Sequence, residues 1–152
     1  MDNLQSKCKN VILISSVGVD RCDRFPYKLL NSFGVLNAKK NSENLLINQS
    51  KTKGYNSIIC RPGRLVGSPF TNFDLAKLFQ IDQGINKGIL IDSSGIDQLD
   101  GDAERRDVAE VVARIALLDK EPKGKSIIFS IVNQPGDRPK NPKEWNQLIR
   151  YL

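Results

Sequence analysis

The feature that most constrains the fold is the apolar run Val11-Ile12-Leu13-Ile14, which leads directly into Ser15-Ser16-Val17-Gly18. An apolar run without alternation, ended by small residues, is typical of a strand buried on both faces of a parallel sheet. Ligands of open α/β sheets bind beyond the carboxyl ends of such strands. The sequence therefore predicts a strand over residues 11–16, with Ser16 as a candidate functional residue at its end.

Similar apolar runs recur along the chain, and helical patterns separate them. The main strands are predicted over residues 11–16, 56–61 and 126–132, all parallel, with a shorter one at 89–91. Helices are predicted over about 29–48, 72–80, 105–118 and 142–152. Pro62-Gly63 should end the second strand, because proline cannot donate to a ladder. This alternation predicts an α/β fold, and the length of 152 residues predicts one domain.

Composition excludes several classes of function. The net charge of +6 is spread over helices and loops among acidic residues, which favours a solvated surface over a nucleic-acid interface. The chain has no histidine, and its three cysteines form no C-x-x-C pair, so we expect no metal site and a reducing, cytoplasmic compartment. No apolar run approaches the ~20 residues that span a bilayer, so no membrane span is predicted.

Four motifs occur in a characteristic order. These are Ile14-Ser15-Ser16-Val17-Gly18-Val19, then Lys39 with Glu43, then Ile59-Cys60-Arg61-Pro62-Gly63-Arg64-Leu65, and finally Arg105-Arg106-Asp107-Val108-Ala109-Glu110. Together they resemble the atypical short-chain dehydrogenase/reductases of the NmrA-like, NAD(P)-binding type, over about residues 11–133. The resemblance implies the C-terminal part of a Rossmann-like, doubly wound parallel sheet, and a cytoplasmic protein or one of the plastid stroma.

The resemblance also implies that part of the family's coenzyme site is missing. A full member begins with βαβ units whose glycine-rich turn holds the pyrophosphate, and no G-x-x-G-x-x-G occurs in this chain. We therefore expect residues 1–152 to form a partial NAD(P)-binding domain, from a natural short form or a truncated one. Weak or no binding of NAD(P) is expected for this chain alone.

By the same resemblance, Ser16 matches the catalytic serine, and Lys39 matches the lysine that binds the nicotinamide ribose. The segment 61–65 matches the loop beside the nicotinamide, with Arg61, Pro62, Gly63 and Leu65 as candidate cofactor-binding residues. Plainer interpretations stay open. Serines at strand ends commonly satisfy local backbone groups, Lys39 could be a solvated lysine, and Pro-Gly alone can end a strand. Asp107 is interpreted as a helix-start residue rather than a catalytic base.

The family's catalytic tyrosine, four residues before the lysine, is replaced by Val35, which has no proton to give. Two functions therefore remain open: an NAD(P)-binding oxidoreductase-like or epimerase-like protein with an incomplete site, or a non-catalytic binding or assembly factor. In the full fold, a strand from the missing half would flank residues 11–16. We therefore expect that strand to have an open edge that self-associates or binds a protein partner.

Overall fold

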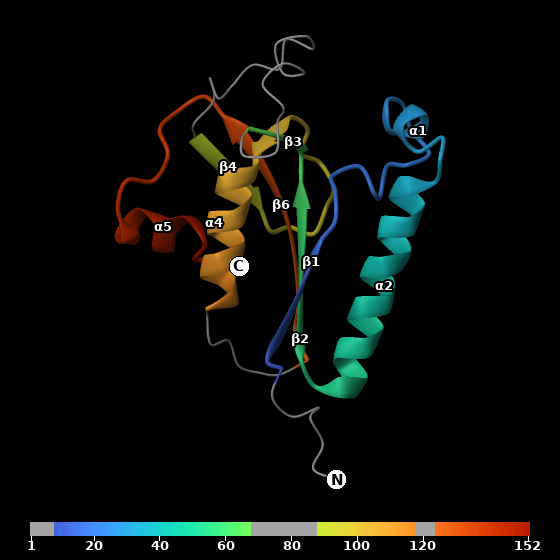
Figure 1. The fold of residues 1–152 in the computed structure, drawn as a ribbon, viewed down its shortest axis with the longest axis horizontal. Coiled ribbons are helices and arrows are strands. Elements are labelled where there is room, and N and C mark those ends of the chain that lie inside the picture. The colour runs from blue at the N-terminus through green and yellow to red at the C-terminus, as the bar shows by residue number, and fades with distance from the viewer. Residues whose placement is uncertain (1–7, 68–87, 118–123) are drawn as a thin grey trace.

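The computed structural model describes residues 8–67, 88–117 and 124–152, and these contain a four-stranded sheet of order β1-β2-β6-β4 (Figure 1). Three parallel strands form most of it: β1 (Asn10–Ile14), β2 (Asn56–Pro62) and β6 (Ser126–Gln134). The predicted α/β fold with three main parallel strands is confirmed. The shorter strand predicted at 89–91 is present as β4 (Gly88–Asp92), but it runs antiparallel to β6, a direction that the sequence did not indicate.

The second strand ends at Pro62-Gly63 as predicted, but Pro62 itself is still paired as the last residue of β2. Pro62 remains in β2, in register with Ile131 of β6, and its carbonyl accepts a hydrogen bond of 3.0 Å from the Val17 amide. A proline lacks only the donor, so its carbonyl still joins β2 to the segment after β1. A second, two-stranded sheet follows immediately, in which β3 (Arg64–Val66) pairs in parallel with β5 (Asp102–Glu104). Neither short strand was predicted.

The predicted helix over residues 29–48 is wrong at its start, because two helices are present. A single turn, α1 (Tyr27–Leu30), is separated from the long α2 (Val35–Lys53) by Gly34, whose φ is +72°. Such a left-handed conformation suits glycine and interrupts a helix. The Asn31 side-chain oxygen then accepts hydrogen bonds from the amides of Leu36 (2.9 Å) and Asn37 (3.2 Å), so it satisfies donors that are free at a helix start.

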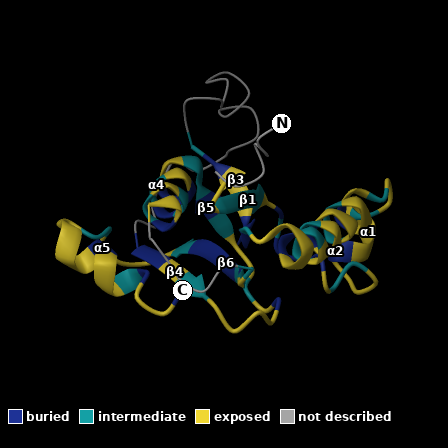
Figure 2. Cartoon of the chain, turned by 90° about the horizontal axis from the view of Figure 1, so that it is seen from below, coloured by how far each residue is buried: buried dark blue, intermediate teal, exposed yellow. Residues whose placement is uncertain are grey.

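Helices cover both faces of the sheet. In Figures 1 and 2, α4 (Arg105–Ala116) and α5 (Pro142–Leu148) lie on one face, and α2 lies on the other. The two predicted C-terminal helices are confirmed, although α5 ends earlier than expected. The predicted helix over 72–80 lies outside the described residues. No helix of the described part is long and apolar enough to cross a membrane.

The main core lies between the sheet and α4 with α5. Alternate residues of β2, Ile58 and Cys60, face this side, as expected for a strand whose side chains alternate between faces. Residues of both sheets, of both helices and of the C-terminal end complete the cluster: Ile89, Ala103, Val108, Val111, Ile115, Ile127, Phe129, Ile131, Trp145, Ile149 and Leu152. A smaller cluster, Val17, Val19, Tyr27 and Leu36, joins the segment after β1 to α1 and α2.

Candidate functional site

The candidate site lies where β1 and β2 end. Because these strands are parallel, Ser15-Ser16 after β1 and Pro62-Gly63 at the end of β2 emerge at the same edge of the sheet. Hydrogen bonds from Ser15 N to Cys60 O (2.7 Å) and from Val17 N to Pro62 O (3.0 Å) keep the two segments together beyond β1. The structure thus brings together two of the segments that the sequence singled out.

Lys39 reaches this edge from α2. Its Nζ lies 3.3 Å from the carbonyl oxygen of Ile14 and 3.2 Å from that of Ser15. A lysine ammonium has three donors, so one remains after these two contacts. Lys39 is therefore fixed at the carboxyl end of β1, close to the two serines, rather than extended into solvent.

The two serines differ in their surroundings. Ser16 is partly buried, and its hydroxyl donates to the carbonyl of Val17 (2.9 Å), which is the local backbone contact left open as an alternative. Ser15 is 3% exposed, and its hydroxyl has no hydrogen-bond partner within the described residues. From the sequence, only Ser16 was predicted as a functional residue. A buried hydroxyl without a partner calls for an explanation such as a ligand, so Ser15 joins the candidates.

The side chain of Arg61 is held by carboxylates rather than being free at the carboxyl ends of β1 and β2. Its Nε and Nη2 lie 3.0 and 2.6 Å from the two carboxylate oxygens of Glu43 in α2, and its Nη1 lies 2.7 Å from Asp20 Oδ2. The side chains of Arg61 and Glu43 are only 2% and 1% exposed. Burial disfavours the charge of Arg61, but Glu43 and Asp20 outweigh it, so the pKa of the guanidinium is raised. Arg61 thus joins β2, α2 and the segment after β1.

Asp20 also contacts Lys40 of α2, so each of its two oxygens has a cationic partner. Burial alone would raise the pKa of Asp20, but its bonds to Lys40 and Arg61 lower it below the ordinary value of 3.8. Glu43, Arg61, Asp20 and Lys40 form a group that we call the Arg61 network. It holds α2, and with it Lys39, against the ends of β1 and β2.

Gly63 and Leu65 lie just beyond the end of β2. A Cβ atom on Gly63 would lie 2.3 Å from the carbonyl oxygen of Gly101, so the absence of a side chain is required by neighbouring backbone. Gly63 also donates to the carbonyl of Ile131 at 3.0 Å. Leu65 lies in β3 and is 39% exposed. Close backbone packing therefore explains Gly63, whereas Leu65 keeps an accessible side chain.

The segment after β1 is held by a second polar group that the sequence did not reveal. Asp97 is buried and accepts hydrogen bonds of 2.9 Å from the amides of Gly18 and Asp20. Arg21 lies 3.3 Å from Asp97 and stacks over the Tyr27 ring at 4.4 Å. Burial, together with the hydrogen bond to Asp100, raises the pKa of Tyr27 to about 12. The Tyr27 hydroxyl is thus engaged with Asp100, away from the contacts of Lys39.

An open cavity of about 580 Å³ adjoins this second polar group. It is lined by Asp20, Arg21, Arg24, Ile96, Asp97 and Gln98.

The tyrosine that would donate a proton beside Lys39 is replaced by Val35. This valine is the first residue of α2 and is 51% exposed. The described residues also contain no group of three or more histidines, cysteines or carboxylates that could hold a metal ion.

Asp107 lies in the first turn of α4, which agrees with its interpretation as a helix-start residue. It is also an ion-pair partner. Its Oδ1 lies 2.6 Å from Arg138 Nε, and its Oδ2 accepts from Asn133 at 2.8 Å. Glu104 lies 2.5 Å from the same guanidinium. This group joins α4 to the end of β6 and to the segment before α5, and none of these long-range contacts was predicted.

Comparisons with known protein families and with curated proteins found no match. Among solved structures, the chain is similar to the oxidoreductase ylbE from Lactococcus lactis, with a TM-score of 0.59 and 18% identity. The similarity covers 95% of this chain and 52% of that one, so the chain spans about half the length of its structural relative. At this identity, the likeness shows the fold alone, and it confirms an α/β, Rossmann-like arrangement.

Proposed function

We propose that this chain is an oxidoreductase-like, NAD(P)-binding protein whose edge at the ends of β1 and β2 forms the nicotinamide side of the coenzyme site. The observation that carries the proposal is the position of Lys39, whose Nζ lies 3.2 Å from the carbonyl of Ser15, beside Ser16. The order of motifs shared with the atypical short-chain dehydrogenase/reductases supports it. The fold shared with ylbE, a protein described as an oxidoreductase, is consistent with it.

The residues at this edge fit the polar end of such a coenzyme. Ser15 has a buried hydroxyl without a partner among the described residues, and the Lys39 ammonium has one donor left for a ribose hydroxyl. When bound, the coenzyme would supply or accept a hydride. The chain's own part is to bind and orient the coenzyme. Lys39 and the serines would offer hydrogen bonds, and the exposed side chain of Leu65 would offer an apolar contact.

Calorimetric titration with NAD⁺ and NADP⁺ tests this proposal. We expect binding no tighter than roughly 0.1 mM, or about −5.5 kcal/mol, because no glycine-rich turn holds the pyrophosphate. Lys39→Met should weaken it about tenfold, since a hydrogen bond to a charged group contributes about 1.5 kcal/mol or more. Lys51→Met is the matched control, because Lys51 is an exposed lysine in the last turn of α2, twelve residues beyond Lys39 and outside the Arg61 network. Equal affinity in wild type and Lys39→Met would refute the proposal.

Val35 favours a second candidate function, that of a non-catalytic binding or assembly factor that retains the fold. Its half-exposed side chain stands one helical turn before Lys39 and cannot donate a proton. We expect no NADPH oxidation with generic aldehydes or ketones, even where coenzyme binding is detectable. Measurable turnover that is lost in Lys39→Met would instead identify a catalyst that uses another proton donor.

A further inference from the structure

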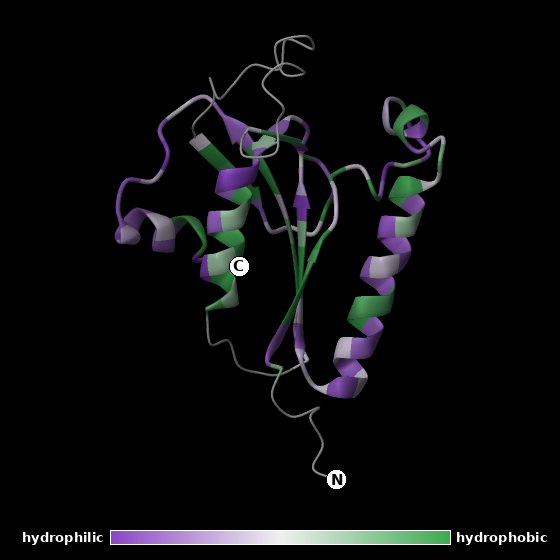
Figure 3. Cartoon of the chain, in the orientation of Figure 1, coloured by the Kyte–Doolittle hydropathy of each residue, from purple (hydrophilic) through white to green (hydrophobic). Residues whose placement is uncertain are grey.

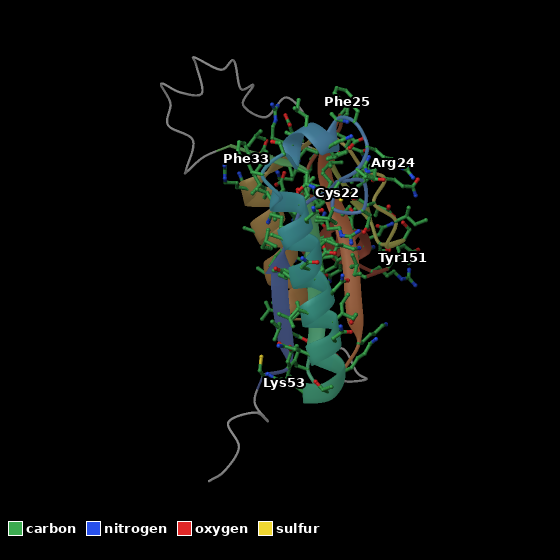
Figure 4. The ribbon with its side chains drawn as sticks, turned by 90° about the vertical axis from the view of Figure 1, so that its right-hand side faces the viewer. Cys22, Arg24, Phe25, Phe33, Lys53 and Tyr151 are labelled. Atoms are coloured by element: carbon green, nitrogen blue, oxygen red, sulfur yellow. The ribbon has the colours of Figure 1, made fainter. Side chains whose placement is uncertain are left out.

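A group of large apolar side chains projects from α1 and its flanks. Phe25 is 85% exposed, Leu29 69%, Leu30 63% and Phe33 93%. We call these four residues the apolar tip. Figure 4 shows Phe25 and Phe33 at the same end of the molecule, and Figure 3 shows hydrophobic residues over α1, at the upper end of α2. Single exposed apolar residues are common, whereas four large ones within residues 25–33 favour an interaction site.

The apolar tip has a well-defined support. The ring of Tyr27 is buried and packs against Gly18, where an added Cβ atom would lie only 2.0 Å from the ring. The Tyr27 hydroxyl bonds to Asp100. On the other side, Asn31 is fixed by its bonds to the start of α2. A single helical turn held at both ends presents Leu29 and Leu30 outward while Tyr27 faces inward. The exposure therefore follows from how α1 is anchored.

Positive charges flank the apolar tip. Residues 24–42 contain four lysines and arginines and no aspartate or glutamate. Lys39 and Lys40 are engaged at the site, whereas the exposed Arg24 and Lys28 have no side-chain ion pair within the described residues. Four carboxylates also lie in this region. Asp23 is exposed, and Asp100 is held by Arg21 and Tyr27. Asp20 and Asp97 line one cavity with Arg24, but Asp20 is paired with Lys40 and Arg61, and Asp97 with Arg21. Arg24 and Lys28 together thus leave a small excess of positive charge over the exposed Asp23 beside the four apolar side chains.

We propose that the apolar tip docks on an anionic lipid surface. Aromatic and leucine side chains with adjoining lysine or arginine are the composition of segments that lie in a membrane interface. The apolar side chains would enter the headgroup boundary, while Arg24 and Lys28 would contact lipid phosphates. A projecting tip suits a deformable lipid surface, whereas a protein partner would have to supply a complementary groove. This docking is peripheral and does not depend on coenzyme binding.

Flotation with lipid vesicles tests the proposal on the 152-residue chain. Vesicles of phosphatidylcholine with about a third phosphatidylglycerol should carry the protein, and vesicles of phosphatidylcholine alone should carry much less of it. Phe33→Ser should lower the partition coefficient about tenfold, because it removes a large apolar side chain from the contact. Lys28→Ser should lower it about fivefold and reduce its dependence on salt.

Leu45→Ser is the matched control, because Leu45 is an exposed apolar residue (58%) of α2 that lies ten residues beyond Val35, about 15 Å along the helix. It should bind vesicles like the wild type. The proposal is overturned if neither vesicle carries the protein, if Phe33→Ser and Leu45→Ser have equal effects, or if binding ignores lipid charge. It is equally overturned if the tip proves to be a self-association surface, seen as a dimer that Phe33→Ser abolishes while vesicles remain empty.

Discussion

The two faces of the sheet are joined to their helices by different forces. Toward α4 and α5, the contact is a continuous apolar cluster that includes Cys60 and Phe129, neither of which is measurably exposed. Toward α2, the deepest contact is the Arg61 network, an ion-paired group that lies beside the candidate site. Figure 2 shows buried residues on both sides, so the difference is one of chemistry rather than of depth.

This difference suggests a division of tasks. Apolar packing is non-directional and stabilises roughly in proportion to buried area, whereas charge-assisted hydrogen bonds fix geometry. We therefore expect the α4 face to supply most of the stability. The α2 face should set the position of Lys39 against the end of β1.

The largest loss of stability should come from the α4 face. Phe129→Ala should lower the free energy of unfolding by about 3–5 kcal/mol, and Leu36→Ala, in the small cluster near α2, by about 2 kcal/mol. Phe129 is completely buried among many neighbours, whereas Leu36 belongs to a cluster of four buried residues. Urea unfolding measures both variants. A Leu36→Ala variant that loses as much as Phe129→Ala would contradict the proposed division.

The Arg61 network should respond unlike an apolar contact. Arg61→Met alone should destabilise the protein by about 3 kcal/mol, because it leaves the buried Glu43 carboxylate without its partner. The double variant Glu43→Leu/Arg61→Met should return to within about 1 kcal/mol of wild type, since apolar pairs can replace buried ion pairs. A double-mutant cycle in urea gives the coupling. Additive losses would show that the two residues do not act as a pair.

The open edge of β1 should cause association, because the strand has β2 as its one partner in the described sheet and is uncharged. Light scattering after size exclusion at micromolar concentration should give a mass above the 17.0 kDa of the monomer. Ile14 is 41% exposed, so Ile14→Lys should fold and should weaken association about tenfold, or about 1.4 kcal/mol. A monodisperse monomer with a cooperative thermal transition would contradict this expectation.

The smallest effect should come from Asp20. Its pKa is lowered in the folded state, so its stabilising contribution is present above the unfolded value near 3.8 and is lost as pH falls through the folded value. Asp20 is partly exposed, so we expect less than about 1 kcal/mol. Asp20→Asn should remove this part of the pH dependence. If wild type and variant lose stability in parallel from pH 6 to about pH 2, Asp20 contributes nothing through ionisation.

The sequence predicted what is local and periodic. Apolar runs located β1, β2 and β6, and the spacing of Val108, Val111 and Ile115 located α4. The break at Gly34 was missed because the apolar pattern continues across it. Asn31 followed by Gly34 was the available signal, since an asparagine can satisfy amides at a helix start.

Long-range polar contacts were beyond what the pattern could show. Glu43 and Arg61 were noted as parts of motifs, but nothing in their spacing indicated that each is the other's buried partner. Likewise, the pairing of Asp107 with Arg138 joins residues 31 positions apart. The roles of Ser16, Lys39, Pro62, Gly63 and Leu65 toward a coenzyme remain predictions. The structure shows Lys39 and Ser15-Ser16 together, and it shows Arg61 committed to the network.

We propose that a ligand binds on the α2 side of the sheet, at the carboxyl ends of β1 and β2. Amide chemical shifts, followed during titration of the ¹⁵N-labelled chain with NADPH to about 1 mM, test it most directly. We predict shifts concentrated in residues 14–18, 36–40 and 63–65, with α5 unchanged and with Lys39→Met reducing the response. Shifts centred on α5, or no shifts at this concentration, would contradict the claim.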